Sequence, residues 1–125
     1  MTPIEEQFEI LTGQETQASL QKLPDGSHLI MVPSIKLPNG WSKPIVDVKF
    51  IAPVGYPFAQ PDCFWADLDL RLANGNLPMN AQQNAIPHIG TNHLWFSWHV
   101  TSWNPNFDSL ITYLFVIKRR LSDPR

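Results

Sequence analysis

Two residue types in this sequence could supply a nucleophile for covalent chemistry: a cysteine, and a serine that stands close to a histidine. Cys63 is the only cysteine, and Ser97 lies two positions before His99. A thiolate or a serine hydroxyl can accept an acyl group when a neighbouring base removes its proton. His99 or His93 could be that base for Cys63 if the fold brings them together.

Cys63 also has an interpretation that involves no chemistry. A free cysteine is among the most buried residue types and packs as a small apolar side chain. A reactive thiol needs an electropositive, partly exposed setting, whereas Cys63 is flanked by Asp62, Phe64 and Trp65. We therefore favour packing in the core for Cys63.

Ser97 and His99 are separated by a single residue. On an extended stretch their side chains point the same way but lie ~6–7 Å apart, which is too far for a base to reach the hydroxyl. The acid considered for orienting the imidazole, Asp108, is remote in the sequence. We favour ordinary hydrogen bonds to the backbone for both residues.

The histidines and acidic residues form no metal-binding pattern. His88, His93 and His99 are spaced by five and six residues, without an interleaved cysteine or acid. We expect no metal and no cofactor.

A charged stretch contains Asp62, Asp67, Asp69 and Arg71. Its flanks do not indicate the apolar pocket that a catalytic carboxylate pair requires, so we expect a solvated strand end.

Five aromatic residues fall within thirteen positions, namely Trp95, Phe96, Trp98, Trp103 and Phe107. Such residues bury large apolar areas, and tryptophan is also frequent among the anchors of protein interfaces. We expect Trp103 in the core and one exposed face among Trp95 and Trp98.

The composition indicates a folded chain that does not bind nucleic acid. Of its 125 residues, 43% are apolar and 16% are charged, which excludes a disordered chain. The net charge of −2 and the pI near 6.0 leave no basic excess for phosphate binding. Neither a membrane span nor a secretory signal is evident. We expect one cytoplasmic domain over residues 1–125.

The hydrophobic pattern predicts an antiparallel meander that must position these residues. We expect strands at residues 17–23, 28–32, 45–51 and 62–65. Pro24-Asp25-Gly26 and Asn39-Gly40 have turn chemistry. Alternation places Val46, Val48 and Phe50 toward the core. Residues 66–92 show no period and are expected to form a long irregular segment.

A helix is predicted at each end of the chain. Thr2 and Pro3 are typical of a helix start, and Gly13 of its end. We expect Asp108 to cap a second helix, whose apolar residues have helical spacing: Leu110, Ile111, Leu114, Phe115, Ile117 and Leu121. The run Lys118-Arg119-Arg120 suits a helix C-terminus. The result is an α+β fold, with the C-terminal helix packed on the sheet.

Several motifs follow one another in a recognisable order. They are Gly55-Tyr56-Pro57, Pro61-Asp62-x-Phe64, Leu70-Arg71-x-Ala73-Asn74-Gly75, Trp95-x-Ser97-Trp98-His99 and Trp103-Asn104-Pro105. Over residues 3–121 the chain resembles the ubiquitin-conjugating (UBC) fold, and more narrowly prokaryotic conjugating-enzyme family E. The resemblance implies a UBC-like fold. It also implies two partners, a ubiquitin-like protein and its activating enzyme.

The chain departs from that family at the position of its catalytic residue. The UBC pattern places the acyl-carrying cysteine about eight residues before the tryptophan of Trp-x-Pro, and counting back from Trp103 reaches Trp95. The upstream His-Pro-Asn element is also missing, with Asn92 and Asn80 as the nearest asparagines.

We therefore expect a bacterial UBC-fold component without the usual cysteine, which binds partners through Tyr56, Pro57, Trp95, Trp98 and Asn92. Two alternatives stay open. One is an active conjugating enzyme that uses Cys63 as a thioester or Ser97 as an oxyester. The other is an interaction domain that shares only the fold.

Overall fold

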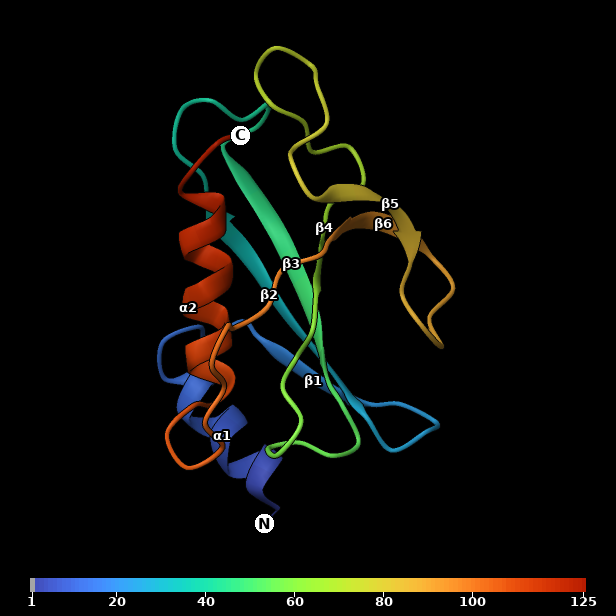
Figure 1. Ribbon diagram of the computed structural model, residues 1–125, viewed down its shortest axis with the longest axis vertical. Coiled ribbons are helices and arrows are strands. Elements are labelled where there is room, and N and C mark those ends of the chain that lie inside the picture. The colour runs from blue at the N-terminus through green and yellow to red at the C-terminus, as the bar shows by residue number, and fades with distance from the viewer. Residues whose placement is uncertain (1) are drawn as a thin grey trace.

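The computed structural model describes residues 2–125, which form two helices and one antiparallel sheet (Figure 1). In chain order the elements are α1 (Pro3–Thr12), β1 (Ser19–Lys22), β2 (His28–Lys36), β3 (Ile45–Ala52), β4 (Phe64–Ala66), β5 (Ala81–Ala85), β6 (Asn92–Phe96) and α2 (Leu110–Leu121). The predicted α+β, UBC-like architecture is confirmed, with a helix at each end of the described chain and the meander between them.

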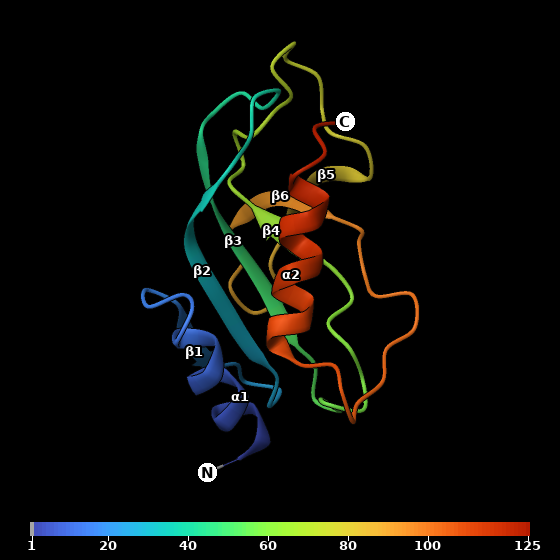
Figure 2. The ribbon, with the colours of Figure 1, turned by 90° about the vertical axis from the view of Figure 1, so that its left-hand side faces the viewer.

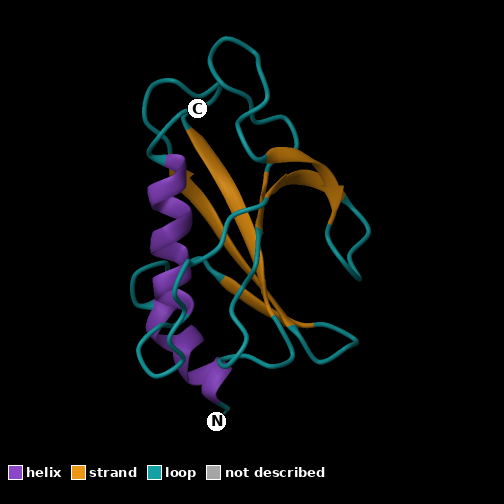
Figure 3. Cartoon of the chain, viewed as in Figure 1, coloured by secondary structure: helices purple, strands orange, loops and turns teal. Residues whose placement is uncertain are grey.

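The six strands lie in the order β1-β2-β3-β4-β6-β5, and each pairs antiparallel with its neighbours. Helix α2 lies along one face of this sheet (Figures 1 and 3). The main core fills the space between them, and its largest buried side chains include Phe50, Phe64, Phe96 and Tyr113. The rings of Phe50 and Tyr113 are 5.0 Å apart, so α2 is fixed to the middle of the sheet.

Strand β3 has the alternation that its sequence predicts, because Val46, Val48 and Phe50 are all buried in the main core. Strand β2 continues beyond its predicted end through a bulge. Ser34 adopts a φ of +59° there, and its N–H donates to Asp47 Oδ1 at 2.9 Å. The carboxylate of β3 thus stabilises an irregularity that allows β2 to stay paired.

The predicted N-cap residue is confirmed for α1 and is wrong for α2. Thr2 caps α1 as predicted, since its Oγ1 accepts the Glu5 N–H at 3.3 Å. The N-cap of α2 is Ser109 rather than Asp108, and the Ser109 N–H donates to Thr112 Oγ1 at 3.0 Å. The Asp108 carboxylate is engaged one turn earlier, where it accepts the Asn104 N–H at 2.7 Å.

Two strands lie outside the four that were predicted: β6, and β5 within the segment predicted to be irregular. β5 lies within residues 66–92 and pairs with β6 at the end of the sheet. Its sequence, Ala-Gln-Gln-Asn-Ala, has no apolar alternation, and most of its side chains are exposed. Backbone pairing with β6 forms the strand where the side-chain pattern gives no signal. Within residues 2–125, neither helix has the length and apolar character needed to cross a membrane.

Candidate functional site

The segment at which the UBC pattern expects its cysteine is β6, which lies between β4 and β5. Phe96 pairs with Phe64 of β4, and their rings stack at 4.6 Å inside the main core. The next residue back, Trp95, pairs with Trp65 and points to the opposite face of the sheet. The expected nucleophile position is therefore part of a regular strand and holds an indole.

That opposite face carries a second apolar cluster, which we call the outer cluster. Its buried members are Leu23, Leu29, Trp65 and Ile86, with Ile51, Cys63, Ile89 and Trp95 partly buried against them. The β1–β2 turn and the β5–β6 turn come together beside it, where His88 Nε2 lies 3.6 Å from Asp25 Oδ2. The outer cluster is thus covered by two turns, whereas a helix covers the main core.

Cys63 belongs to the outer cluster and is half-buried. Burial raises the pKa of its thiol; the Trp95 side chain lowers that pKa in part, and the charge of Asp62 raises it further. A nucleophilic cysteine requires the opposite shift, because only its thiolate attacks. The candidate bases have other partners: His93 Nε2 lies 3.1 Å from Lys49 Nζ, and His99 has an acidic neighbour.

That neighbour is Asp62, whose Oδ1 lies 3.8 Å from His99 Nδ1. The prediction that no acid except the remote Asp108 could orient His99 is wrong, because the fold brings the segment after the Tyr-Pro motif beside His99. Ser97 is exposed, and its N–H donates to the Asn80 carbonyl oxygen at 3.0 Å. The structure therefore supplies His99 with a carboxylate and Ser97 with a backbone partner.

No three side chains of the types His, Cys, Asp and Glu gather into a metal-binding group within residues 2–125. The three histidines considered for such a site lie next to three different partners. His88 is near Asp25, His93 near Lys49, and His99 near Asp62.

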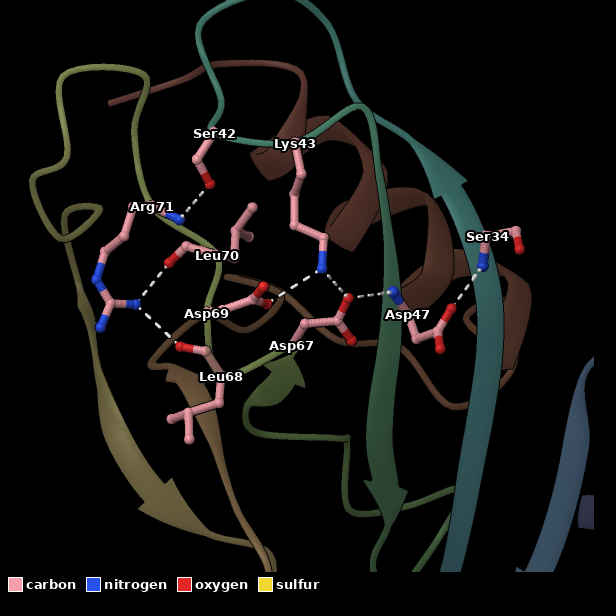
Figure 4. A network of polar contacts seen from close by, with 9 residues as sticks. All are labelled: Ser34, Ser42, Lys43, Asp47, Asp67, Leu68, Asp69, Leu70 and Arg71. Atoms are coloured by element: carbon pink, nitrogen blue, oxygen red, sulfur yellow. Dashed lines mark hydrogen bonds and ion pairs between the residues drawn. The ribbon is translucent and has the colours of Figure 1, made fainter.

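The charged stretch after β4 connects two loops (Figure 4). Lys43 Nζ lies 2.7 Å from Asp67 Oδ2 and 3.1 Å from Asp69 Oδ1. The Arg71 guanidinium donates to the carbonyl oxygens of Leu68 and Leu70, while its backbone N–H donates to Ser42 Oγ at 2.9 Å. The hydrogen bond with Asp67 raises the pKa of Lys43. These acids hold a lysine and the backbone rather than facing each other as a catalytic pair.

The predicted binding residues Tyr56 and Pro57 belong to the segment after β3, and Tyr56 lines a pocket together with Thr2 and Pro3 at the start of α1. That segment and the start of α1 lie at the same end of the molecule (Figure 2). The Trp103 indole donates to the Pro57 carbonyl oxygen at 2.7 Å, and its ring lies 6.2 Å from that of Tyr56. The Tyr56 hydroxyl donates to Gln7 Oε1 of α1. Trp103, which was predicted to lie in the core, is only half-buried, because it joins the Tyr-Pro segment to the segment before α2.

Two large apolar side chains are exposed on these joined segments. Phe58 is 82% exposed and Phe107 is 83% exposed, and Val54 is exposed nearby in the sequence. We call these three residues the Phe58–Phe107 surface. Phe58 was not among the predicted binding residues, and Phe107 was considered only as one of the five clustered aromatic residues. The only available signal was a phenylalanine between prolines, in a segment that forms no regular structure.

The remaining predicted binding residues lie elsewhere. Trp98 is half-buried beside α2, and its carbonyl oxygen accepts the Tyr113 hydroxyl at 2.7 Å. Trp95 is a member of the outer cluster, and Asn92 is exposed at the start of β6. The five predicted residues therefore do not form one surface.

The fold order, the Tyr-Pro segment and the Trp-Asn-Pro element before α2 define a protein of the E2-like class. The family described as Prokaryotic E2 family E has a model that matches residues 9–123. The chain belongs to this family. Comparison with curated proteins and with solved structures finds no match.

Proposed function

We propose that this chain is a non-catalytic E2-like component of a bacterial ubiquitin-like conjugation system. In the cytoplasm it would bind the ubiquitin-like protein or its activating enzyme without accepting the modifier covalently. The observation that carries this proposal is Trp95: eight residues before Trp103, the strand holds an indole packed in the outer cluster.

The properties of the only thiol support the same proposal. Cys63 packs against the same cluster, and its thiol has a raised pKa because it is buried. At neutral pH little of it is the thiolate that thioester formation requires.

The Phe58–Phe107 surface is the place where we expect the partner to bind. Exposed phenylalanines cost free energy in water, and two of them on joined segments are typical of a protein interface. The hydrogen bonds of Tyr56 with Gln7 and of Pro57 with Trp103 hold the segment that carries Phe58 against α1 and against the segment before α2.

The first test is a charging assay. The chain is incubated with its cognate activating enzyme, the ubiquitin-like protein and ATP, and the products are separated without reducing agent. We expect no covalent adduct on this chain. A matched variant, Trp95→Cys, restores a thiol to the expected position, and we expect it to stay uncharged because the side chain at 95 points into the outer cluster.

The second test measures binding to each of the two components. Phe58→Ala and Phe107→Ala are each expected to weaken binding by about tenfold or more, as truncation of a hot-spot side chain does. Phe115→Ala is the matched control, because Phe115 is 62% exposed on α2 and lies outside the surface. If the control weakens binding as much as the two variants do, the surface is misplaced. If neither component binds, the alternative of an interaction domain that shares only the fold is favoured.

One observation favours an active enzyme as the second candidate. Cys63 contacts the same cluster as Trp95, so the thiol lies beside the strand position at which the family keeps its nucleophile. A thiol-sensitive adduct that is lost in Cys63→Ala would establish this function. A thiol-resistant, base-labile adduct that is lost in Ser97→Ala would indicate the oxyester, with His99 and Asp62 beside it.

A further inference from the structure

Strand β5 forms one end of the sheet, and only one of its two sides is paired (Figures 1 and 3). β6 lies along that side, whereas no strand of the described residues 2–125 lies along the other. We call this free side of residues 81–85 the β5 edge. The middle of the strand, Gln82, Gln83 and Asn84, is exposed. Such an edge presents backbone N–H and C=O groups with which another strand can pair.

The hydrogen bonds at the two ends of β5 show which of its backbone groups face the β5 edge. The Ser97 N–H donates to the Asn80 oxygen at 3.0 Å, and the Ile86 N–H donates to the Thr91 oxygen at 3.2 Å. The register between these bonded pairs is regular, and bonded and non-bonded pairs alternate in an antiparallel ladder. The even-numbered residues of β5 therefore bond to β6, and the N–H and C=O groups of residues 81, 83 and 85 point outward.

Most of these outward groups are free. Within residues 2–125, the backbone groups of Ala81 and Gln83 that point to the β5 edge have no hydrogen-bond partner. The Ala85 N–H donates to Asn84 Oδ1 at 2.9 Å, so a side chain takes the place of a partner strand at that end. The β5 edge is thus open for pairing over the length of the strand.

The β5 edge also lacks the features that usually prevent edge strands from pairing. Natural edges are protected by lysine, by proline or by very short strands. The other end of the sheet follows this rule, because β1 has four residues and ends in Lys22. β5 has five residues without a charge or a proline, and residues 72–87 contain no charged side chain. A second β5 can therefore approach without charge repulsion.

The sequence of β5, Ala-Gln-Gln-Asn-Ala, is complementary to itself. A two-fold axis at Gln83 pairs Ala81 with Ala85 of a second copy, and Gln82 with Asn84. Because both backbone groups of Gln83 point outward, the two Gln83 residues exchange both N–H···O bonds. The amides of Gln82 and Asn84 each contain a donor and an acceptor, so they can bond to each other across the interface.

We propose that two copies of this chain pair through their β5 edges, antiparallel and about a two-fold axis at Gln83, to form one continuous sheet. Such an interface uses the same residues on both copies and closes at two. One short strand buries little area, so the dimer is weak and forms at high concentration.

This inference goes beyond the proposed function and uses a different surface, since neither Phe58 nor Phe107 belongs to β5. Gln83→Pro is expected to leave binding of the conjugation partner unchanged, and Phe58→Ala is expected to leave the dimer unchanged. The two proposals can therefore fail separately.

The test measures the mass of the full chain by sedimentation equilibrium at concentrations up to about 1 mM. We expect the mass to rise from the 14.3 kDa of one copy toward twice that value and no further. Gln83→Pro removes an N–H that points away from β6, so the strand is kept, and dimer formation is expected to weaken about tenfold or more. Circular dichroism checks that the variant is folded. A chain that stays at one copy, grows beyond two, or dimerises equally as folded Gln83→Pro overturns the proposal.

An exchange of charges tests the register. The axis places position 83 of one copy opposite position 83 of the other, so Gln83→Lys alone and Gln83→Glu alone each bring like charges together. Each is expected to weaken the dimer about fivefold, and an equimolar mixture is expected to restore it. Gln21→Lys makes the same change at an exposed position of β1 and is expected to have no effect. A mixture that does not recover, or an equal loss in Gln21→Lys, excludes this pairing.

Discussion

The two faces of the β-sheet differ in what covers them and in which residues they hold. The face beneath α2 contains Phe50, Phe64 and Phe96, all fully buried under a helix of twelve residues. The outer face packs against residues of the β1–β2 and β5–β6 turns and their flanks, such as Leu23 and Ile86, and these turns meet at the His88–Asp25 pair. Cys63 and Trp95, the residues that bear on catalysis, both lie on this thinly covered outer face and are half-buried.

This difference is consistent with the proposal that this E2-like fold does not use the usual nucleophile. The main core holds residues such as Phe96, whereas its neighbour Trp95, at the position where the UBC pattern is expected to place a cysteine, packs in the outer cluster. The side chain at position 95 can therefore differ without a change in the main core.

The largest expected effect is on the face beneath α2. Phe96→Ala removes a fully buried ring that stacks on Phe64 and is expected to lower the free energy of unfolding by about 3–5 kcal/mol. Urea unfolding followed by circular dichroism measures it. Phe115→Ala on α2 is the matched control, with an expected change within about 0.5 kcal/mol because that ring is exposed.

Equal losses of unfolding free energy in Phe96→Ala and Phe115→Ala would contradict the difference between the buried and the exposed ring. They would mean that α2 does not cover this face as the structure shows.

Much of the fold could be predicted because local patterns and tertiary environment agree. Val46, Val48 and Phe50 alternate in sequence and are buried together, and Thr2 and Pro3 begin α1 as their types suggest. β5 could not be predicted, since its strand depends on backbone pairing with β6. Phe115 has helical spacing but points to solvent, because periodicity alone does not say how wide the buried face of a helix is.

The candidate site was less predictable, because exposure and charge pairing depend on distant segments. The missing cysteine could be read from the spacing before Trp103, whereas the Asp62–His99 pair joins residues far apart in sequence. Arg120 belongs to a basic run that suits a helix end, but the fold buries it among aromatic rings. No sequence pattern separates such an arginine from its exposed neighbour Arg119.

An intermediate effect is expected on the outer face. Trp95→Ala removes a half-buried indole from the outer cluster and is expected to cost about 2 kcal/mol, less than Phe96→Ala. The same unfolding experiment measures it, and iodoacetamide labelling of Cys63 is expected to accelerate as the cover is lost. A cost as large as that of Phe96→Ala would show that both faces support the fold equally.

The smallest expected effect on stability concerns Cys63. Cys63→Ala is expected to lower the free energy of unfolding by about 1 kcal/mol or less, because the thiol is small and only partly buried. Its reactivity is the more informative measurement. The native thiol is expected to react with iodoacetamide more slowly than the same thiol in urea, as mass spectrometry over a pH series would show.

The sign of the pH dependence separates packing from catalysis at this position. Burial raises the pKa of Cys63, so the native thiolate forms at higher pH than the unfolded one, and the midpoint of the rate profile is expected to move upward on folding. A catalytic setting would move it downward, because positive neighbours would stabilise the thiolate. A native midpoint below that of the urea-unfolded chain would favour the active-enzyme alternative, and it would mean that the outer face is a reactive surface rather than a second core.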